Sequence, residues 1–207
     1  HYRGAESEAA QLEKELNAAR AGSAMKVRGD LLAPVAPKAL VDAALQRFAR
    51  LDILVNNASA FYPTAMGQIE LGHWEELIGS NLRAPLFLSQ AAAPRLALAW
   101  ATRLIWFFST AASTRATSTS KPWRLCSVRM PRGTASPATR LALAGGVIVN
   151  IADIHAERPL KGYVVYSIAK SGLVALTRSL ALELAPGVRV NAVAPGAIAW
   201  PEDGQFD

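Results

Sequence analysis

Three short apolar runs, separated by longer amphipathic segments, constrain the fold of this chain most strongly. The runs are Leu51-Asp-Ile-Leu-Val55, Val147-Ile-Val-Asn-Ile-Ala152 and Val188-Arg-Val-Asn-Ala-Val193. Short runs rich in Val and Ile predict buried strands, and helical patterns between them predict parallel strands joined by crossover helices. We therefore expect an α/β fold with a doubly wound parallel sheet. Active sites of such sheets lie at the carboxyl ends of the strands.

The segments around these runs have the periodicity of amphipathic helices. The first predicted helix runs from about Glu6 to Arg20 with an apolar stripe, and Gly22 follows it as a stop signal. Further helices are predicted for residues 38–50 and 73–96, and for a stretch that contains Tyr166 and continues to Leu184. A further strand is predicted for Met25–Asp30, before a turn.

Asp153, Tyr166 and Lys170 form the group of side chains best suited to chemistry. Tyr166 and Lys170 are four residues apart, so they share one face of a helix. An ammonium favours a phenolate by charge, so we expect Lys170 to lower the pKa of Tyr166 and make it a usable proton donor. Asp153 directly follows a predicted strand, at the sheet edge where active sites lie.

Four blocks in this order resemble the short-chain dehydrogenase/reductase family. They are Asn56-Asn-Ala-Ser-Ala-Phe-Tyr-Pro63, Gly79-Ser-Asn-Leu-Arg-Ala-Pro-Leu-Phe87, Tyr166-x-x-x-Lys170 and Pro195-Gly196. The family usually has Ser thirteen residues before its Tyr, whereas this chain has Asp153. An Asp at this position resembles the pteridine reductases within the family. A Tyr-x-x-x-Lys pair alone would be weak, because helices often carry that spacing by chance.

The resemblance implies a single Rossmann-type domain that binds a nicotinamide cofactor. The family's first strand with its Gly-rich turn, and its last strand, have no counterpart in this sequence, so we expect the fold without them. Arg3 stands where the family discriminates its two cofactors, and a cation there would pair with a ribose 2′-phosphate. NADPH/NADP is therefore the expected cofactor, with an ordinary surface arginine as the alternative.

The same resemblance implies further contacts to cofactor and substrate. Residues expected at the cofactor, besides Arg3, are Asp30, Asn57, Ala58, Ser59, Lys170, Pro195 and Gly196. For Asp30, which would hydrogen-bond adenine, a turn cap is the alternative. Phe61 is expected to lie parallel to a flat pterin, with Ser59, Asp153 and Tyr166 as further substrate contacts. Asn81 matches the family Asn that holds a water beside the catalytic Lys; core packing is the alternative.

Residues 97–144 do not match the pattern of the rest. They interrupt the step from a helix to the Val147 strand, and much of the segment lacks apolar periodicity. Between Leu77 and Ala152 there are nine basic and no acidic residues, and the remainder holds 13 basic and 16 acidic ones. We expect an atypical, disordered insertion at 97–144, between a cofactor-binding half at 1–96 and a catalytic half at 145–207.

Composition excludes several other classes of protein. Because the net charge of +6 comes from one segment, it does not indicate a nucleic-acid partner. The longest apolar stretch, 84–108, is broken by Pro94, Arg95 and Arg103, so we expect no membrane span. No His or carboxylate partners sit at ligand spacing, so we expect no metal site. A single cysteine, Cys126, and the lack of a charged-then-apolar leader favour the cytoplasm.

The sequence thus favours an NADPH-dependent reductase of pterins or folates, homo-oligomeric when complete. Lys170 would bind the nicotinamide ribose, and Asp153 would supply a proton to a ring nitrogen through Tyr166. One alternative is a short-chain reductase of simple carbonyls, such as 3-oxoacyl or sugar substrates. The other is a catalytically inactive fragment of such an enzyme, favoured by the missing Gly-rich turn. The sequence therefore predicts a reductase, and it leaves undecided whether this incomplete chain is active.

Overall fold

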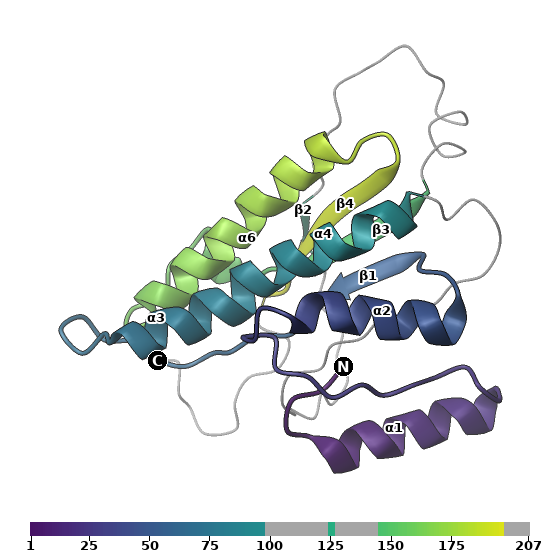
Figure 1. Cartoon of the computed structure of the whole chain (residues 1–207). Helices are drawn as coiled ribbons and strands as arrows, with labels where there is room; N and C mark the ends of the chain where they lie inside the picture. Colours follow the sequence, from purple (N-terminus) through teal and green to yellow (C-terminus); the bar gives the residue numbers. More distant parts are fainter. Residues whose placement is uncertain (98–123, 127–144, 197–207) are drawn as a thin grey trace.

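The computed structural model describes residues 1–97, 124–126 and 145–196. Its centre is a sheet of strands β1 (Ile53–Asn56), β3 (Gly146–Ile151), β4 (Val188–Ala194) and β2 (Arg124–Cys126), in the order β1-β3-β4-β2 (Figure 1). β1 pairs with β3, and β3 with β4, in parallel. β2 pairs with β4 antiparallel. The three parallel strands are those predicted from the apolar runs, and the α/β class is confirmed.

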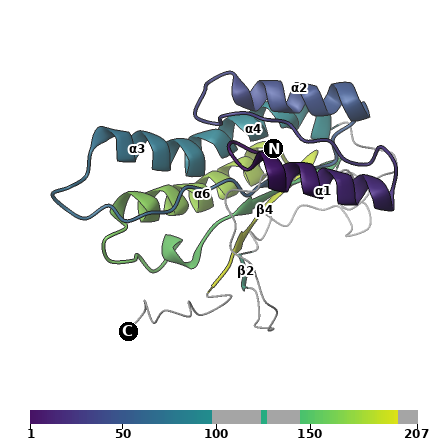
Figure 2. The same cartoon turned by 90° about the horizontal axis from the view of Figure 1, so that it is seen from below.

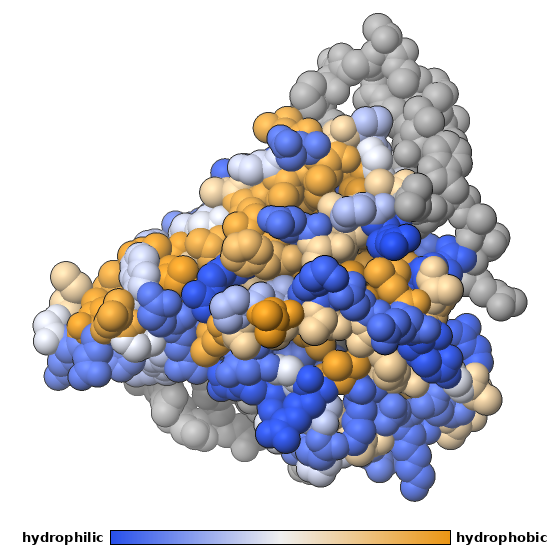
Figure 3. All heavy atoms as spheres, viewed as in Figure 1, coloured by the Kyte–Doolittle hydropathy of each residue, from blue (hydrophilic) through white to orange (hydrophobic). Residues whose placement is uncertain are grey.

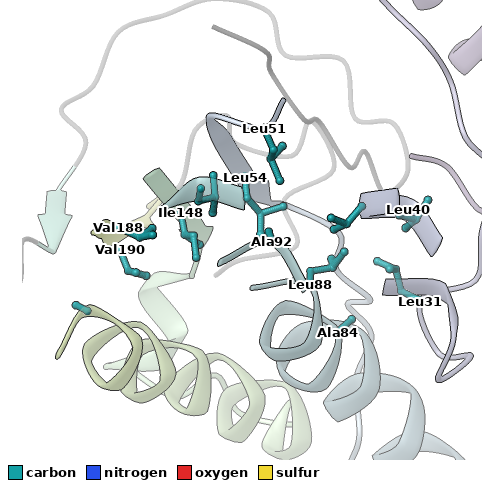
Figure 4. Close-up of a cluster of buried hydrophobic side chains, with 13 residues drawn as sticks. Leu31, Leu40, Leu51, Leu54, Ala84, Leu88, Ala92, Ile148, Val188 and Val190 are labelled. Carbon is teal, nitrogen blue, oxygen red and sulfur yellow. The ribbon is translucent and has the colours of Figure 1, made fainter. Parts of the chain in front are cut away.

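Helices α2 (Ala36–Phe48), α4 (Ala84–Leu96) and α6 (Val164–Glu183) lie on the same side of this sheet (Figure 2). The alternation of side chains along each strand explains the packing. Leu54, Ile148 and Val190 are buried and belong to one cluster with side chains of the helices (Figure 4). Helix residues in this cluster are Leu40, Val41, Ala84, Leu88, Ala92, Leu96 and Ala181. The core therefore fixes the sheet against the helix that carries the catalytic candidates.

The helix predicted for 73–96 is built from three pieces. α3 (Leu71–Ile78) continues through a π-helical segment, η1 (Gly79–Arg83), into α4. Extra residues in a π-turn shift the helix faces relative to each other, and such turns occur frequently at functional sites. Asn81 lies within this segment and is buried.

The strand predicted for Met25–Asp30 is wrong. The structure has only an isolated parallel bridge there, between Tyr2 and Arg28. The reason is that the partner segment runs through Gly4 into helix α1 (Glu6–Ala19), so pairing ends after one position. α1 has the predicted bounds but buries no residue, and Leu12 and Leu16 on its stripe are exposed. Polar contacts hold this region, including Lys26 with Glu6 and Asn17 with the backbone of Ala24.

Most of the segment 97–144, which we expect to be an inserted region, lies outside the described residues. Three residues within it, Arg124–Cys126, form β2 on the edge of the sheet. None of the helices among the described residues combines the length and apolar character needed to cross a bilayer.

Candidate active site

The candidate site lies where the carboxyl ends of β1, β3 and β4 meet. A loop at residues 57–64 follows β1, Asp153 follows β3 two residues after its end, and Pro195 follows β4. The backbone N–H of Ile154 donates to the carbonyl of Pro195 at 3.3 Å, so the segments after β3 and β4 are adjacent. Parallel pairing thus brings together residues that are far apart in the sequence, as predicted from the strand order.

Asp153 and Tyr166 are joined directly. The Tyr166 hydroxyl donates to Asp153 Oδ2 at 2.6 Å. Asp153 Oδ1 accepts from the backbone N–H of His155 at 2.9 Å and so caps the short 3₁₀ helix η2 (Ile154–Ala156). The cap fixes the carboxylate, because an oxygen held by the backbone leaves the other oxygen aimed in a defined direction. A proton can therefore pass along a preformed hydrogen bond between the carboxyl group and the phenol.

The environment of Tyr166 raises the pKa of its phenol. Burial is the largest cause, because only 4% of the residue is exposed, and the hydrogen bond and negative charge of Asp153 act in the same direction. The nearby Ser59 hydroxyl acts in the opposite direction on the pKa but does not reverse the effect. The expected lowering by Lys170 is therefore wrong for this structure. The Lys170 ammonium lies 5.6 Å from the centre of the Tyr166 ring and donates elsewhere.

Lys170 is buried, with its ammonium at the end of β3. Nζ donates to the carbonyl of Ile151 at 3.0 Å. Burial lowers the pKa of Lys170 from 10.5 to about 8, and the charge of Asp153 opposes that change. An ammonium has three N–H donors, and this is the one hydrogen bond that it makes among the described residues. Lys170 therefore keeps donor capacity for hydroxyl groups of a ligand.

Asn81 connects the π-helical segment η1 to the loop after β1. Its Nδ2 donates to the carbonyls of Ala60 and Leu77, each at 2.9 Å. Its Oδ1 accepts from the Ser59 hydroxyl at 2.6 Å. The buried amide thus holds two consecutive loop residues, Ser59 and Ala60, beside the catalytic candidates. The placement shows a fixed loop; it does not test the predicted water-holding role.

Phe61 lies over the first turn of α6, between two tyrosines. Its ring stacks on Tyr163 at 4.7 Å between centres and 15° between planes, and meets Tyr166 edge-on at 4.7 Å and 72°. Phe61 is nevertheless 52% exposed. An aromatic surface that is partly open to solvent therefore contacts the Tyr166 ring. We did not predict Tyr163, although its i,i+3 spacing from Tyr166 puts both on one helix face.

Comparison with known proteins identifies the family. The sequence model described as "short chain dehydrogenase" matches residues 2–121, and one described as "Enoyl-(Acyl carrier protein) reductase" matches residues 126–206. This chain belongs to the short-chain dehydrogenase/reductase family. The resemblance predicted from its motifs is confirmed, and the family is one of oxidoreductases that act on small molecules with a nicotinamide cofactor.

Two relatives of this chain have names that refer to different substrates. "Pteridine reductase 1" of Leishmania tarentolae is 35% identical, over 100% of this chain and 69% of its own length. "Granaticin polyketide synthase putative ketoacyl reductase 2" of Streptomyces violaceoruber is 30% identical, over 93% of this chain and 61% of its own length. The chain thus spans less than three quarters of each relative.

The residues expected at a nicotinamide cofactor fall into two groups. Lys170, Ser59 and Pro195 lie at or beside the Asp153–Tyr166 pair. Leu31, which follows Asp30, and Ala58 line one small hollow together with Asn56, so the segments after residue 30 and after β1 are adjacent. Buried donors on Lys170 and a small side chain at Ala58 fit the ribose and nicotinamide portion of such a cofactor.

Arg3 and Asp30, which were expected at the cofactor, contact other residues of the protein in this structure. Arg3 is on the surface, with Nη1 3.5 Å from Glu76 Oε1 of α3. Asp30 accepts from the backbone N–H of Leu32 at 2.9 Å, which is the turn-capping arrangement. Asn57 lies directly after β1, and Gly196 lies two residues after the end of β4. The roles of these four residues remain predictions.

Proposed function

We propose that this chain forms the catalytic part of an NADPH-dependent reductase of pterins or folates. The observation that carries the proposal is the 2.6 Å hydrogen bond from Tyr166 to Asp153, beside the exposed ring of Phe61. A ring nitrogen next to the reduced carbon needs a proton, and a carboxyl–phenol pair can deliver one. The relative named pteridine reductase 1 supports the same substrate class.

Each residue of the site has a role in this proposal. Tyr166 gives its hydroxyl proton to the substrate nitrogen, and Asp153, in its protonated form, restores a proton to the Tyr166 oxygen along the hydrogen bond that joins them. Lys170 donates to ribose hydroxyls and provides positive charge near the transferred proton. Phe61 supports the flat heterocycle by stacking, which favours aromatic substrates over chain-like carbonyl compounds. Asn81 holds Ser59 and Ala60, and with them the loop after β1, in position beside these groups.

The cofactor, when bound, supplies the hydride. Arg3 is proposed to pair with the 2′-phosphate that distinguishes NADPH from NADH. To do so it must exchange Glu76 for the phosphate. The exchange is feasible because the two groups are 3.5 Å apart and the Arg3 side chain is 58% exposed, where ion pairs contribute little.

A second candidate function is the reduction of simple carbonyl groups. It is favoured by the Streptomyces relative, which is named a putative ketoacyl reductase. A carbonyl reductase needs a hydroxyl to hold the substrate oxygen, and position 153 carries a carboxylate instead. Asp153→Ser therefore converts the site toward this second chemistry.

The decisive experiment compares substrates and binding in one preparation. Nicotinamide fluorescence is titrated with the chain first; saturable NADPH binding shows a competent cofactor site. Dihydrobiopterin or folate is then compared with an acetoacetyl thioester as substrate, for the parent chain and for Asp153→Ser. Faster turnover of the pterin by the parent supports the proposal. Turnover of the thioester alone supports the second function, and no binding at high micromolar NADPH means that this length of chain is inactive.

We also propose that the complete protein is a homo-oligomer. Apolar side chains gather on the outer faces of α4 and α6 (Figure 3), and Phe87, Ile168 and Leu182 on these helices are exposed. Large exposed apolar residues that gather on a surface indicate an interaction site. Light scattering on the purified protein tests this: a monomer at micromolar concentration rejects it.

A further inference from the structure

The first turn of α6 carries the catalytic tyrosine but lacks a local cap. Tyr166 is the third residue of the helix, and the N-cap residue Tyr163 makes no side-chain cap hydrogen bond. The first N–H groups of any helix have no partner within it, so they need one from elsewhere. The backbone N–H of Val165 has such a partner: it donates to the hydroxyl of Thr64 at 3.3 Å, from 101 residues away in the sequence.

Thr64 is attached to this turn by its backbone as well. Its N–H donates to the carbonyl of Gly162 at 2.5 Å, and it forms an isolated parallel bridge with Tyr163. Only 2% of Thr64 is exposed. Water therefore cannot replace its hydroxyl easily, and loss of the hydroxyl leaves a buried N–H without a partner.

The position of Thr64 in the loop after β1 gives these contacts a consequence for the site. Asn81 holds the same loop at Ser59 and Ala60, and Phe61 lies between the two points of attachment. Phe61 in turn contacts the ring of Tyr166. The loop is thus fixed at one end to η1 and at the other to α6, with the aromatic surface between them.

We propose that Thr64 is a positioning residue, which caps the first turn of α6 and so sets the Tyr166 hydroxyl against Asp153 and the Phe61 ring. The inference rests on the proposed reductase function for its kinetic consequence, but not for its structural one. We expect removal of the hydroxyl to loosen the turn rather than the fold, because α6 is also held further along by the buried side chains of Leu173, Thr177 and Ala181.

The test uses three substitutions in the whole chain. Thr64→Val removes the hydroxyl at nearly constant volume, and Thr64→Ser keeps it. Thr177→Val is the matched control, because Thr177 is an equally buried threonine on α6 whose hydroxyl accepts from Asn150 at 2.9 Å, away from Tyr166. If Thr64→Val does not fold, Thr64→Ala removes the same hydroxyl.

Amide hydrogen exchange at Val165 is the readout that does not depend on activity. We expect about tenfold faster exchange at Val165 in Thr64→Val, relative to amides of β3, with parent-like exchange in Thr64→Ser and Thr177→Val. In pterin reduction, kcat should fall about 10- to 100-fold in Thr64→Val, while NADPH affinity is retained and Thr64→Ser restores turnover.

The outcomes separate the two claims. If the parent chain reduces no pterin, the proposed function fails, and the exchange experiment alone decides the role of Thr64. Unchanged exchange at Val165 in Thr64→Val overturns the inference. So does an equal loss of kcat in Thr64→Val and Thr177→Val at equal loss of melting temperature, since that would show a general effect on stability.

Discussion

Asp153 determines the electrostatics of the candidate site, because both carboxylate oxygens accept hydrogen bonds from the protein. Asp153→Asn keeps an acceptor for His155 but removes the charge and the proton source. We expect the pKa of Tyr166 to fall toward its usual value, since Asp153 contributes two of the causes that raise it. Pterin turnover should fall about 10²- to 10⁴-fold.

Steady-state kinetics at pH values from about 5 to about 9 measures this fall in pterin turnover and its dependence on pH. Asp42→Asn is the control, because Asp42 pairs with Lys38 on the surface of α2. Equal pterin turnover in the parent and Asp153→Asn would remove Asp153 from the proton path.

Lys170 links function to stability through its lowered pKa. The native pKa is about 8 and the ordinary value is 10.5, so the native state loses its proton first as pH rises. Between these values the unfolded state binds more protons, and the free energy of unfolding therefore rises with pH. Over that window the gain is roughly 3 kcal/mol, and below about pH 8 the cost of the buried charge is fully present.

Lys170→Met removes this buried charge at similar volume. We expect the variant to be inactive but more stable than the parent at pH 7, with the advantage shrinking toward pH 10. Urea unfolding at both pH values measures the gap. Lys38→Met, at an exposed position, should show no such dependence on pH. A constant gap between parent and Lys170→Met would contradict the assigned pKa shift.

For single residues, the sequence predicts which side chains of the site lie close together, but not how their surroundings shift their pKa values. Helix spacing and strand-end position were enough to bring Asp153, Tyr166 and Lys170 together. The direction of the Tyr166 pKa shift depends on burial against Leu77 and Val165, which is set by packing. The stacking of Phe61 on Tyr163 depends on the path of the loop after β1, which is also set by packing.

Among the elements, the π-helical segment η1 holds one end of the loop after β1. Asn81→Ala removes the hydrogen bonds that a buried amide makes to Ser59, Ala60, Leu77 and Ser80. We expect a loss of about 1–3 kcal/mol in the free energy of unfolding, because the partners are left unsatisfied. The substrate KM should also rise, since the loop that carries Phe61 is released.

Asn17→Ala provides the matched control. Asn17 makes two hydrogen bonds to the backbone of Ala24 beside α1, away from the site. It should lower stability without changing KM. If both variants change KM alike, η1 has no special role in binding.

The elements themselves were predicted unequally. The positions of β1, β3, β4, α2, α4 and α6 followed from apolar periodicity, because the same periodicity creates the core; α1 was also predicted in this way but buries no residue. The π-turn was not predicted, since an extra residue in a helix leaves no mark in a short apolar pattern. The strand at Met25–Asp30 was wrong because a strand needs a partner, and the sequence of one segment does not show how long its partner runs.

For the whole molecule, the parallel order of β1, β3 and β4 and the family were predictable, whereas the role of residues 97–144 was not. The structure adds one constraint on that segment. A side chain at Gly145 would meet the carbonyl oxygens of Leu96 and Ala97 at 2.5 and 2.7 Å. The two flanks of residues 98–144 therefore lie directly against each other, which is the arrangement that an inserted segment requires.

This geometry predicts that residues 98–144 can be replaced by a short Gly/Ser linker without loss of the fold. A loop of a few residues spans adjacent ends, and shortening a long loop lowers the entropy cost of closing it. The replacement also removes β2, which pairs with β4 at three positions, so part of the gain is offset. We expect retained NADPH affinity and an unfolding midpoint close to that of the parent. Fluorescence titration and thermal unfolding measure the two quantities, and a second variant with a Gly/Ser segment of the original length separates length from sequence. If the shortened chain fails to fold while the length-matched variant folds, the spacing between α4 and β3 matters and the insertion hypothesis is wrong; if both fail, residues 98–144 contain part of the core.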